Sequence, residues 1–302
     1  MSLVLLPSTV LADTNEYIIG ADAPVPAAFK QPVTTALEVL WDGQFEAGHR
    51  IAATARLRNI ATGNILTIND LRYSSGGQNI SFFLIDPSMT DYQNPKLERS
   101  ETPYAFNFSF IPKLSTSYRL WVITTPNSSG KEEALGGWIG KEEPSFIDRK
   151  LSYKTSMNGY IFTLSSDRAP MVGSSCIINI NVADQDNKPV QSQAQAVSPF
   201  AMEYNMREPN FIIGFYDDFQ NIIHSNEYSE AQESNNAALS ATPNQDLFFT
   251  AQMGRTAAAP SSIGPDYKFK IEPKQQGFVK LFAHLKINGK DMVVPFSFYI
   301  NK

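Results

Sequence analysis

The segment Cys176-Ile-Ile-Asn-Ile-Asn-Val182 places apolar side chains at every second position, which is typical of a β-strand with one buried face. Further segments share this alternation or its enrichment in β-branched and aromatic residues, and Gly, Pro, Asn or Asp clusters bound them. They are residues 51–58, 79–85, 104–110, 118–123, 211–216, 278–283 and 292–300. No segment has three clean turns of helical periodicity with caps at both ends. The sequence therefore predicts an all-β fold with little helix.

The decisive strand also has a counterpart 125 residues earlier, where Ile51 to Leu57 aligns with Cys176 to Val182, apolar position on apolar position. Two later matches follow in the same order. They set Asn79–Asp86 on Asn210–Asp217 at an offset of 131, and Phe108–Lys113 on Phe269–Lys274 at an offset of 161. The sequence thus predicts two tandem immunoglobulin-like antiparallel β-sandwiches that form an internal repeat, with 30 extra residues in the second copy.

The start of the chain indicates export. Leu3 to Ala12 is a short apolar stretch that ends in Val10-Leu-Ala12, with small residues at the two positions that a signal peptidase reads. We predict a signal peptide remnant over residues 1–12 and a periplasmic or extracellular protein. The remaining predicted parts are an extended lead-in over 13–35, an N-terminal sandwich over 36–140, a linker over 141–150, and a C-terminal sandwich over 151–302.

The extra residues of the second copy form a predicted inserted loop over 226–265. Its ends are small and polar, and little apolar surface is available there to offset the entropy of ordering the backbone. Leu247, Phe248 and Phe249 in its middle are apolar. We expect these three residues to dock or to bind a protein partner.

Composition limits the possible functions. The chain carries 25 Lys plus Arg against 30 Asp plus Glu, a net charge of −5, so a basic surface for nucleic acid is not expected. One cysteine and three histidines exclude a disulfide framework, an iron–sulfur cluster and a multi-histidine metal centre. No stretch reaches the ~18 consecutive apolar residues that a membrane-spanning helix needs. Cys176 is predicted to be a small buried hydrophobe.

Part of the second copy resembles a group of exported bacterial immunoglobulin-like domains, broadly the YtkA-like and related sandwiches. The resemblance is carried by Phe211 to His224, Gly264 to Phe269, Gly277 to Phe282 and Gly289 to Phe296. It covers roughly residues 160–300 and, more faintly, 37–125. The group has a His-x-His-Pro motif and is found in metal-handling contexts, which implies copper. Here only His224 matches the motif, and Ser225-Asn-Glu227 replaces the rest.

Two functions stay open. The first is an exported, non-enzymatic binding protein of the cell envelope or secreted fraction, with no cofactor, an unidentified protein partner and no predicted oligomeric state. The second is a periplasmic copper-handling protein in which His224 and His284 meet on one sheet and methionines add soft ligands. No hydrolase or nucleotide-binding motif occurs. Acidic pairs such as Glu132-Glu133 are predicted to be solvated turns, and Trp41 and Trp138 to be loop aromatics.

Overall fold

The structure is a computed structural model that describes residues 33–73, 79–140, 145–186, 188, 190, 210–228 and 266–302, together with the backbone of 15–19. The chain divides into two compact units, Met1–Asp148 (unit 1) and Arg149–Lys302 (unit 2). Within the described residues the helical content is one 3-10 turn, η1, at Ile68–Asp70. The prediction of an all-β fold is confirmed.

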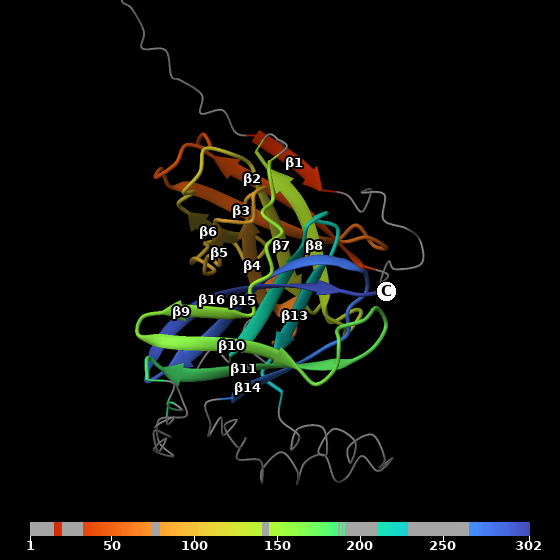
Figure 1. The fold of residues 1–302 in the computed structure, drawn as a ribbon. Helices are drawn as coiled ribbons and strands as arrows, with labels where there is room; N and C mark the ends of the chain where they lie inside the picture. Colours follow the sequence, from red (N-terminus) through yellow and green to blue (C-terminus); the bar gives the residue numbers. More distant parts are fainter. Residues whose placement is uncertain are drawn as a thin grey trace, which may run out of the picture. The chain divides into compact units, whose positions relative to one another are not determined.

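Unit 1 contains two four-stranded antiparallel sheets, with strand orders β1-β2-β3-β6 and β5-β4-β7-β8 (Figure 1). The strands are β1 (Asn15–Ile19), β2 (Thr35–Asp42), β3 (Ile51–Asn59), β4 (Ile80–Ile85), β5 (Tyr92–Gln93), β6 (Phe106–Phe110), β7 (Tyr118–Thr124) and β8 (Glu133–Ile139). One buried cluster joins side chains of both sheets, among them Val39 of β2, Phe108 of β6 and Phe82 of β4. The Phe82 and Phe108 rings stack at 4.4 Å between centroids. This packing makes unit 1 a β-sandwich.

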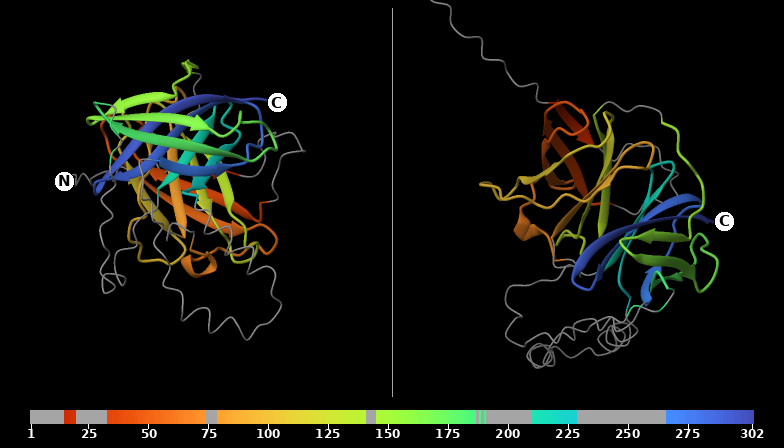
Figure 2. Two further views of the ribbon diagram at one scale, coloured as in Figure 1. Left: turned by 60° about the horizontal axis from the view of Figure 1, so that its bottom comes forward. Right: turned by 60° about the vertical axis from the view of Figure 1, so that its left-hand side comes forward.

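Unit 2 repeats this arrangement, with strand orders β14-β11-β10-β9 and β13-β12-β15-β16. The strands are β9 (Lys154–Met157), β10 (Tyr160–Ser166), β11 (Cys176–Asp184), β12 (Phe211–Tyr216), β13 (Ile222–Asn226), β14 (Asp266–Ile271), β15 (Gly277–Ile287) and β16 (Lys290–Ile300). The long β15–β16 hairpin is visible in the views of Figure 2. It turns at Asn288-Gly289, where both residues have positive φ, as the tight hairpin turns that match strand twist require.

The two units follow one topology, which confirms the predicted repeat. Ile51 to Leu57 on β3 and Cys176 to Val182 on β11 have the same buried alternate positions at the predicted offset of 125. Strands β6 and β14, and β7 and β15, also superpose their inward residues at the predicted offset of 161. Every segment quoted from the sequence contains a strand in the structure, although β4 begins one residue and β6 two residues later than predicted.

One predicted alignment is wrong by a single residue. The inward side chains of β4 include Phe82 and Leu84, whereas those of β12 include Ile212 and Tyr216. Successive side chains on a strand point to opposite faces, so the offset of 131 would set core positions of β4 against outward positions of β12. An offset of 130, from Phe82 to Ile212, brings the inward faces together.

Several smaller predictions also need correction. Trp41 lies in β2 and Trp138 in β8, so neither belongs to a loop. Glu133 is buried and accepts hydrogen bonds from the backbone N–H of Thr34 at 3.1 Å and from its hydroxyl at 2.6 Å. A solvated turn was therefore the wrong prediction for this residue.

The predicted extended lead-in contains a strand, β1, that pairs with β2. The first residues of the predicted inserted loop belong to unit 2's sheets, because Asn226 ends β13 and Glu227 bridges Phe269 of β14. The rest of that loop, with Leu247, Phe248 and Phe249, and the predicted signal peptide remnant lie outside the described residues. The predicted domain limits stay predictions.

Candidate functional site

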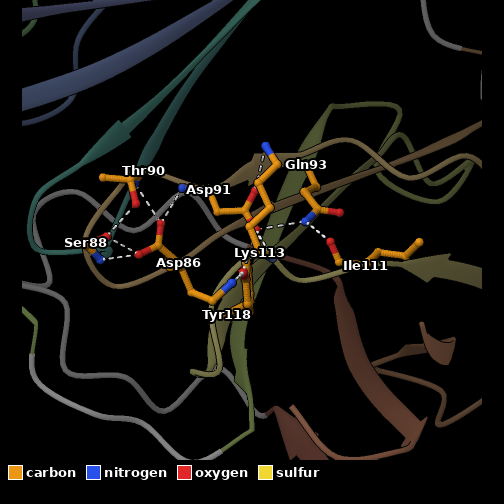
Figure 3. Close-up of polar contacts among 9 residues, drawn as sticks. Asp86, Ser88, Thr90, Asp91, Gln93, Ile111, Lys113 and Tyr118 are labelled. Carbon is orange, nitrogen blue, oxygen red and sulfur yellow. Dashed lines mark hydrogen bonds and ion pairs between the residues drawn. The ribbon is translucent and has the colours of Figure 1, made fainter. Parts of the chain in front are cut away.

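Three loops meet at one end of unit 1: residues 43–50 between β2 and β3, residues 86–91 between β4 and β5, and residues 111–117 between β6 and β7. We call this end the loop platform. It is the part of unit 1 in which buried ionisable side chains gather, and Figure 3 shows its polar contacts. Loops at the end of a sandwich commonly carry function because the sheets hold them in place.

Asp86 closes the first turn of the platform. Its carboxylate accepts hydrogen bonds from the backbone N–H groups of Ser88, Thr90 and Asp91, each at 2.7 Å, and from the Ser88 hydroxyl (Figure 3). The turn also includes Met89, whose φ is 61°, an uncommon value for a residue with a side chain. One buried carboxylate thus satisfies three backbone donors in a turn that lacks regular pairing.

Asp91 connects this turn to the loop after β6. Its Oδ2 atom accepts hydrogen bonds from the Tyr118 hydroxyl at 2.6 Å, the Lys113 backbone N–H at 2.8 Å and the Gln93 side-chain amide at 2.9 Å. Its Oδ1 atom lies 3.4 Å from Nζ of Lys113. Gln93 also donates to the Ile111 carbonyl at 2.6 Å, so a single carboxylate fixes both loops (Figure 3).

The ionisation of this pair follows from its surroundings. Burial opposes a charge on Asp91, but the hydrogen bonds from Tyr118, Lys113 and Gln93 outweigh that cost and lower the pKa of the carboxyl. Burial, together with the hydrogen bond to Asp91, raises the pKa of Tyr118. Asp91 is therefore a stable anion and Tyr118 a stable hydrogen-bond donor, an arrangement that suits a structural role. We call this hydrogen-bonded pair, Asp91 and Tyr118, the polar tie.

Loop 43–50 contacts loop 111–117 and the Tyr118 ring. Gly48 donates its N–H to the Pro112 carbonyl at 2.7 Å, and Ala47 donates to the Ser115 hydroxyl at 3.0 Å. The Phe45 ring stacks near the Tyr118 ring, with 6.3 Å between centroids. All three loops are consequently held by direct contacts.

The platform presents apolar side chains to solvent. Ile111 is 53% exposed and Leu114 is 38% exposed, on either side of Lys113, whose side chain is largely exposed. Exposed apolar residues on a fixed loop lose little entropy when a partner covers them. This geometry is suited to binding a protein.

Sequence reasoning missed the platform. The sequence singled out Asp86 only as a matched residue of the repeat. Asp91 and Tyr118 are 27 positions apart, so their contact is not visible in the sequence. One signal was available: a tyrosine at the start of the strand after β6, with its hydroxyl bonded to backbone a few residues earlier, is a hallmark of immunoglobulin-like domains. Here the Leu114 N–H lies 3.4 Å from the Tyr118 hydroxyl.

The structure places both predicted metal ligands on one sheet of unit 2. His224 on β13 and His284 on β15 flank β12, where they stand opposite Ile213 and Phe211 respectively. The Phe211 ring stacks on His284 at 4.1 Å and lies 6.0 Å from the His224 ring. Strand β12 separates β13 from β15 by about 9.6 Å, twice the interstrand spacing, and the Phe211 ring packs against the imidazoles on both sides.

Other candidate groups were also located. In the part of the chain that the structure describes, no cluster of three or more His, Cys, Asp or Glu side chains is arranged to hold a metal ion. Cys176 is buried on β11, and burial raises the pKa of its thiol to about 11. A thiol with that pKa stays protonated and unreactive at neutral pH, in keeping with its predicted core role.

Comparisons with known proteins give no family. The chain matches no known protein-family description and no curated relative. Similar solved structures include a DUF4785 family protein from Legionella pneumophila, at 9% identity and a TM-score of 0.26 over 88% of this chain and 47% of that one. Invasin, a bacterial integrin-binding protein, has 10% identity and a TM-score of 0.23 over 89% and 39%. Domains 4 and 5 of the S-layer protein SbsC have 10% identity and a TM-score of 0.20 over 85% of this chain and 84% of that one.

The chain spans less than half the length of the first two of these structures. Likeness at this level carries no argument about function, so the fold assignment rests on strand pairing and membership of the YtkA-like group stays a prediction. Among the described residues no helix has the length and hydrophobicity needed to cross a membrane.

Proposed function

We propose that this protein is an exported, non-enzymatic binding protein and that the loop platform of unit 1 contacts its protein partner. The observation that carries the proposal is the pairing of a fixed loop scaffold with exposed Ile111 and Leu114. Asp86 and Asp91 direct their oxygens to loop N–H groups and Tyr118, which supports a positioning role over proton transfer. The signal-like residues 1–12 support export.

The platform offers a matched control at the opposite end of unit 1. Ile60 follows the end of β3 and is 51% exposed, nearly the same as Ile111 at 53%. A photocrosslinking amino acid placed at position 111 should give a discrete adduct in the native envelope or culture medium. The same group at position 60 should give none.

Ile111→Asp and Leu114→Asp should each abolish the adduct formed from a probe at Lys113, without changing the unfolding transition. Equal crosslinking from positions 60 and 111 would show that the platform is not the binding site. N-terminal sequencing of the protein recovered from each cell fraction tests export, because a chain that keeps residues 1–12 in the cytoplasm contradicts it.

Copper handling remains the second candidate, supported by the position of His224 and His284 on either side of one strand. If both bind one ion, Phe211 must move. Titration of Cu(I) and Cu(II) should then show tighter binding by the wild type than by the His224→Ala, His284→Ala double variant. Phe211→Ala should strengthen binding further, and equal binding by all three proteins excludes this candidate.

A further inference from the structure

The two units differ in how their outermost strand is attached. In unit 1, β1 pairs with the outer edge of β2, and in unit 2, β9 pairs with the outer edge of β10. Strands β2 and β10 are equivalent in the repeat, so β1 and β9 cover the same edge of the same sheet. An uncovered edge would present unpaired N–H and C=O groups to other chains.

Strand β9 is fixed to its own unit. Only Asn158 and Gly159 separate it from β10, and their φ angles of 50° and 83° make the tight turn typical of a two-residue hairpin. Ser152 and Ser297 also exchange two backbone hydrogen bonds of 3.0 Å, which join the segment before β9 to β16. This strand cannot leave β10 without disrupting both connections.

Strand β1 has a much longer connection. Its register runs from Asn15 opposite Trp41 to Ile19 opposite Leu37, and 15 residues, 20–34, separate Ile19 from the start of β2. Hairpin connections usually need 2–5 residues. A connection of this length spans about 50 Å when extended, so its geometry does not require β1 and β2 to belong to the same molecule.

We propose that β1 is an exchangeable strand: residues Asn15–Ile19 of one chain pair with the outer edge of β2 in a second copy of this chain. The intermolecular pairing forms the same backbone hydrogen bonds as the internal one, so no new interface has to evolve. Each chain supplies one donor strand and one acceptor edge. Reciprocal exchange produces a closed dimer, and one-way exchange produces a longer chain of molecules.

The internal strand competes with this exchange. A strand joined to its own edge by a connection of 15 residues has an effective concentration there on the order of millimolar. Strand-exchanged dimers therefore remain a minor species in dilute solution. They become abundant when the protein concentration approaches the millimolar range. A covalent trap is needed to detect the exchange at lower concentrations.

The trap uses the register pair Ile18–Glu38. Two chains are prepared, one with Ile18→Cys and the other, carrying a mass tag, with Glu38→Cys, so that neither can form this pair internally. After mixing and mild oxidation, we expect a disulfide-linked heterodimer whose yield rises with time and with protein concentration. The Glu16→Cys and Leu40→Cys pair, which is also in register, should give the same result.

The matched control replaces Glu38→Cys by Arg56→Cys. Arg56 faces Glu38 from β3, so it lies about 9.6 Å from β1, two interstrand spacings and beyond the reach of a disulfide. The heterodimer yield should fall at least about tenfold in this mixture, as the geometric limit on disulfides requires. Equal yields with Glu38→Cys and Arg56→Cys would overturn the proposal.

A chain that carries both Ile18→Cys and Glu38→Cys provides the last control. It should close an internal disulfide and remain monomeric at every concentration in light scattering, while the wild type shows growing dimer or higher mass. If the double variant forms no internal disulfide, β1 does not occupy the β2 edge and the exchange has no basis. Wild-type protein that stays monomeric at millimolar concentration also contradicts the proposal.

Discussion

The two units share one sandwich topology but differ at the end where β4 or β12 finishes and β7 or β15 begins. The difference centres on two buried tyrosines. Tyr118 begins β7 in unit 1, and Val279 occupies the equivalent position of β15 in unit 2. Unit 2 instead has Tyr216 at the end of β12, the position equivalent to Asp86. Tyr118 is hydrogen-bonded to Asp91, whereas the Tyr216 hydroxyl is buried without a well-formed hydrogen bond. A buried carboxylate therefore fixes this end of unit 1. At the same end of unit 2 a buried ring fills the core, and the Gln275 side chain donates to the exposed carboxylate of Asp218 at 2.9 and 3.0 Å.

This difference explains why the binding site is proposed in unit 1. Hydrogen bonds from loop N–H groups to the buried carboxylates of Asp86 and Asp91 set the positions of loops 86–91 and 111–117, which apolar packing does less specifically. The same sheet framework thus carries a buried carboxylate between its loops in unit 1, whereas the corresponding hydrogen bonds of unit 2 go to the exposed Asp218.

The chain contains natural probes that separate the two units. All three tryptophans, Trp41, Trp121 and Trp138, lie in unit 1, and the single cysteine, Cys176, lies buried in unit 2. Tryptophan fluorescence in urea therefore follows the unfolding of unit 1. Labelling of the thiol follows the unfolding of unit 2.

Asp91→Ala is expected to have the largest effect. It leaves the buried Tyr118 hydroxyl and the Lys113 N–H without their acceptor, which should lower the free energy of unfolding of unit 1 by about 3 kcal/mol. Thiol labelling of Cys176 should not change. The control Asp42→Ala removes an exposed carboxylate of unit 1 and should stay within about 0.5 kcal/mol of the wild type. Similar losses of unfolding free energy in both variants would mean that the hydrogen bonds to Asp91 do not stabilise unit 1.

Removing one hydroxyl from each unit sharpens the comparison. Tyr118→Phe should destabilise unit 1 by about 1–2 kcal/mol, because a satisfied hydrogen bond to a charged acceptor is lost. Tyr216→Phe should cost unit 2 less than about 0.5 kcal/mol or stabilise it, since the lost hydroxyl was buried without a well-formed partner. The two urea transitions measure both values, and a larger loss for Tyr216→Phe would reverse the proposed contrast.

The units should also respond oppositely to acid. The pKa of Asp91 is lowered below 3.8, so its stabilisation is present above 3.8 and is lost as pH falls through the folded-state value. Burial raises the pKa of Glu227 above 4.5, so its contribution is present below 4.5 and is lost as pH rises through the folded-state value. Unit 2 should therefore gain stability between neutral pH and 4.5, and unit 1 should lose stability below 3.8.

This pH effect should be smaller than that of Tyr118→Phe. Urea transitions recorded across this pH range, with each unit's own probe, measure it. Glu227→Gln should abolish the gain in unit 2 and leave the tryptophan transition of unit 1 unchanged. A gain that persists in Glu227→Gln would assign the effect to another group.

Arg149→Ala should have the smallest effect. Arg149 forms a 2.7 Å ion pair with Asp217 in unit 2, but the guanidinium is more than half exposed. Exposed pairs contribute about 0–1 kcal/mol and weaken with salt. The thiol-labelling transition should shift by less than about 1 kcal/mol in low salt and by nothing measurable in high salt. A loss as large as that of Asp91→Ala would show that the exposed Arg149–Asp217 pair stabilises unit 2 as much as the buried Asp91 stabilises unit 1.

The sequence by itself determined the strands and most of the repeat. On β3 and β11, one face is apolar and the other polar, so a period of two is visible in the residues and fixes which side chains point inward. The offsets of 125 and 161 follow from that pattern and are confirmed. The copper hypothesis had His224 and His284 on one sheet, where the structure also has them, but the sequence did not indicate the Phe211 ring beside them.

Only the tertiary structure decided how β4 aligns with β12 in the repeat and which residues make up the loop platform. Phe83 and Ile213 are as buried as their inward neighbours, so these strands are apolar at nearly every position and alternation cannot distinguish their faces. A shift of one residue is then invisible in the sequence. The polar tie, the hydrogen bond between Asp91 and Tyr118, joins the loop after β4 to the start of β7, and it exists because the sheet sets these two strands side by side.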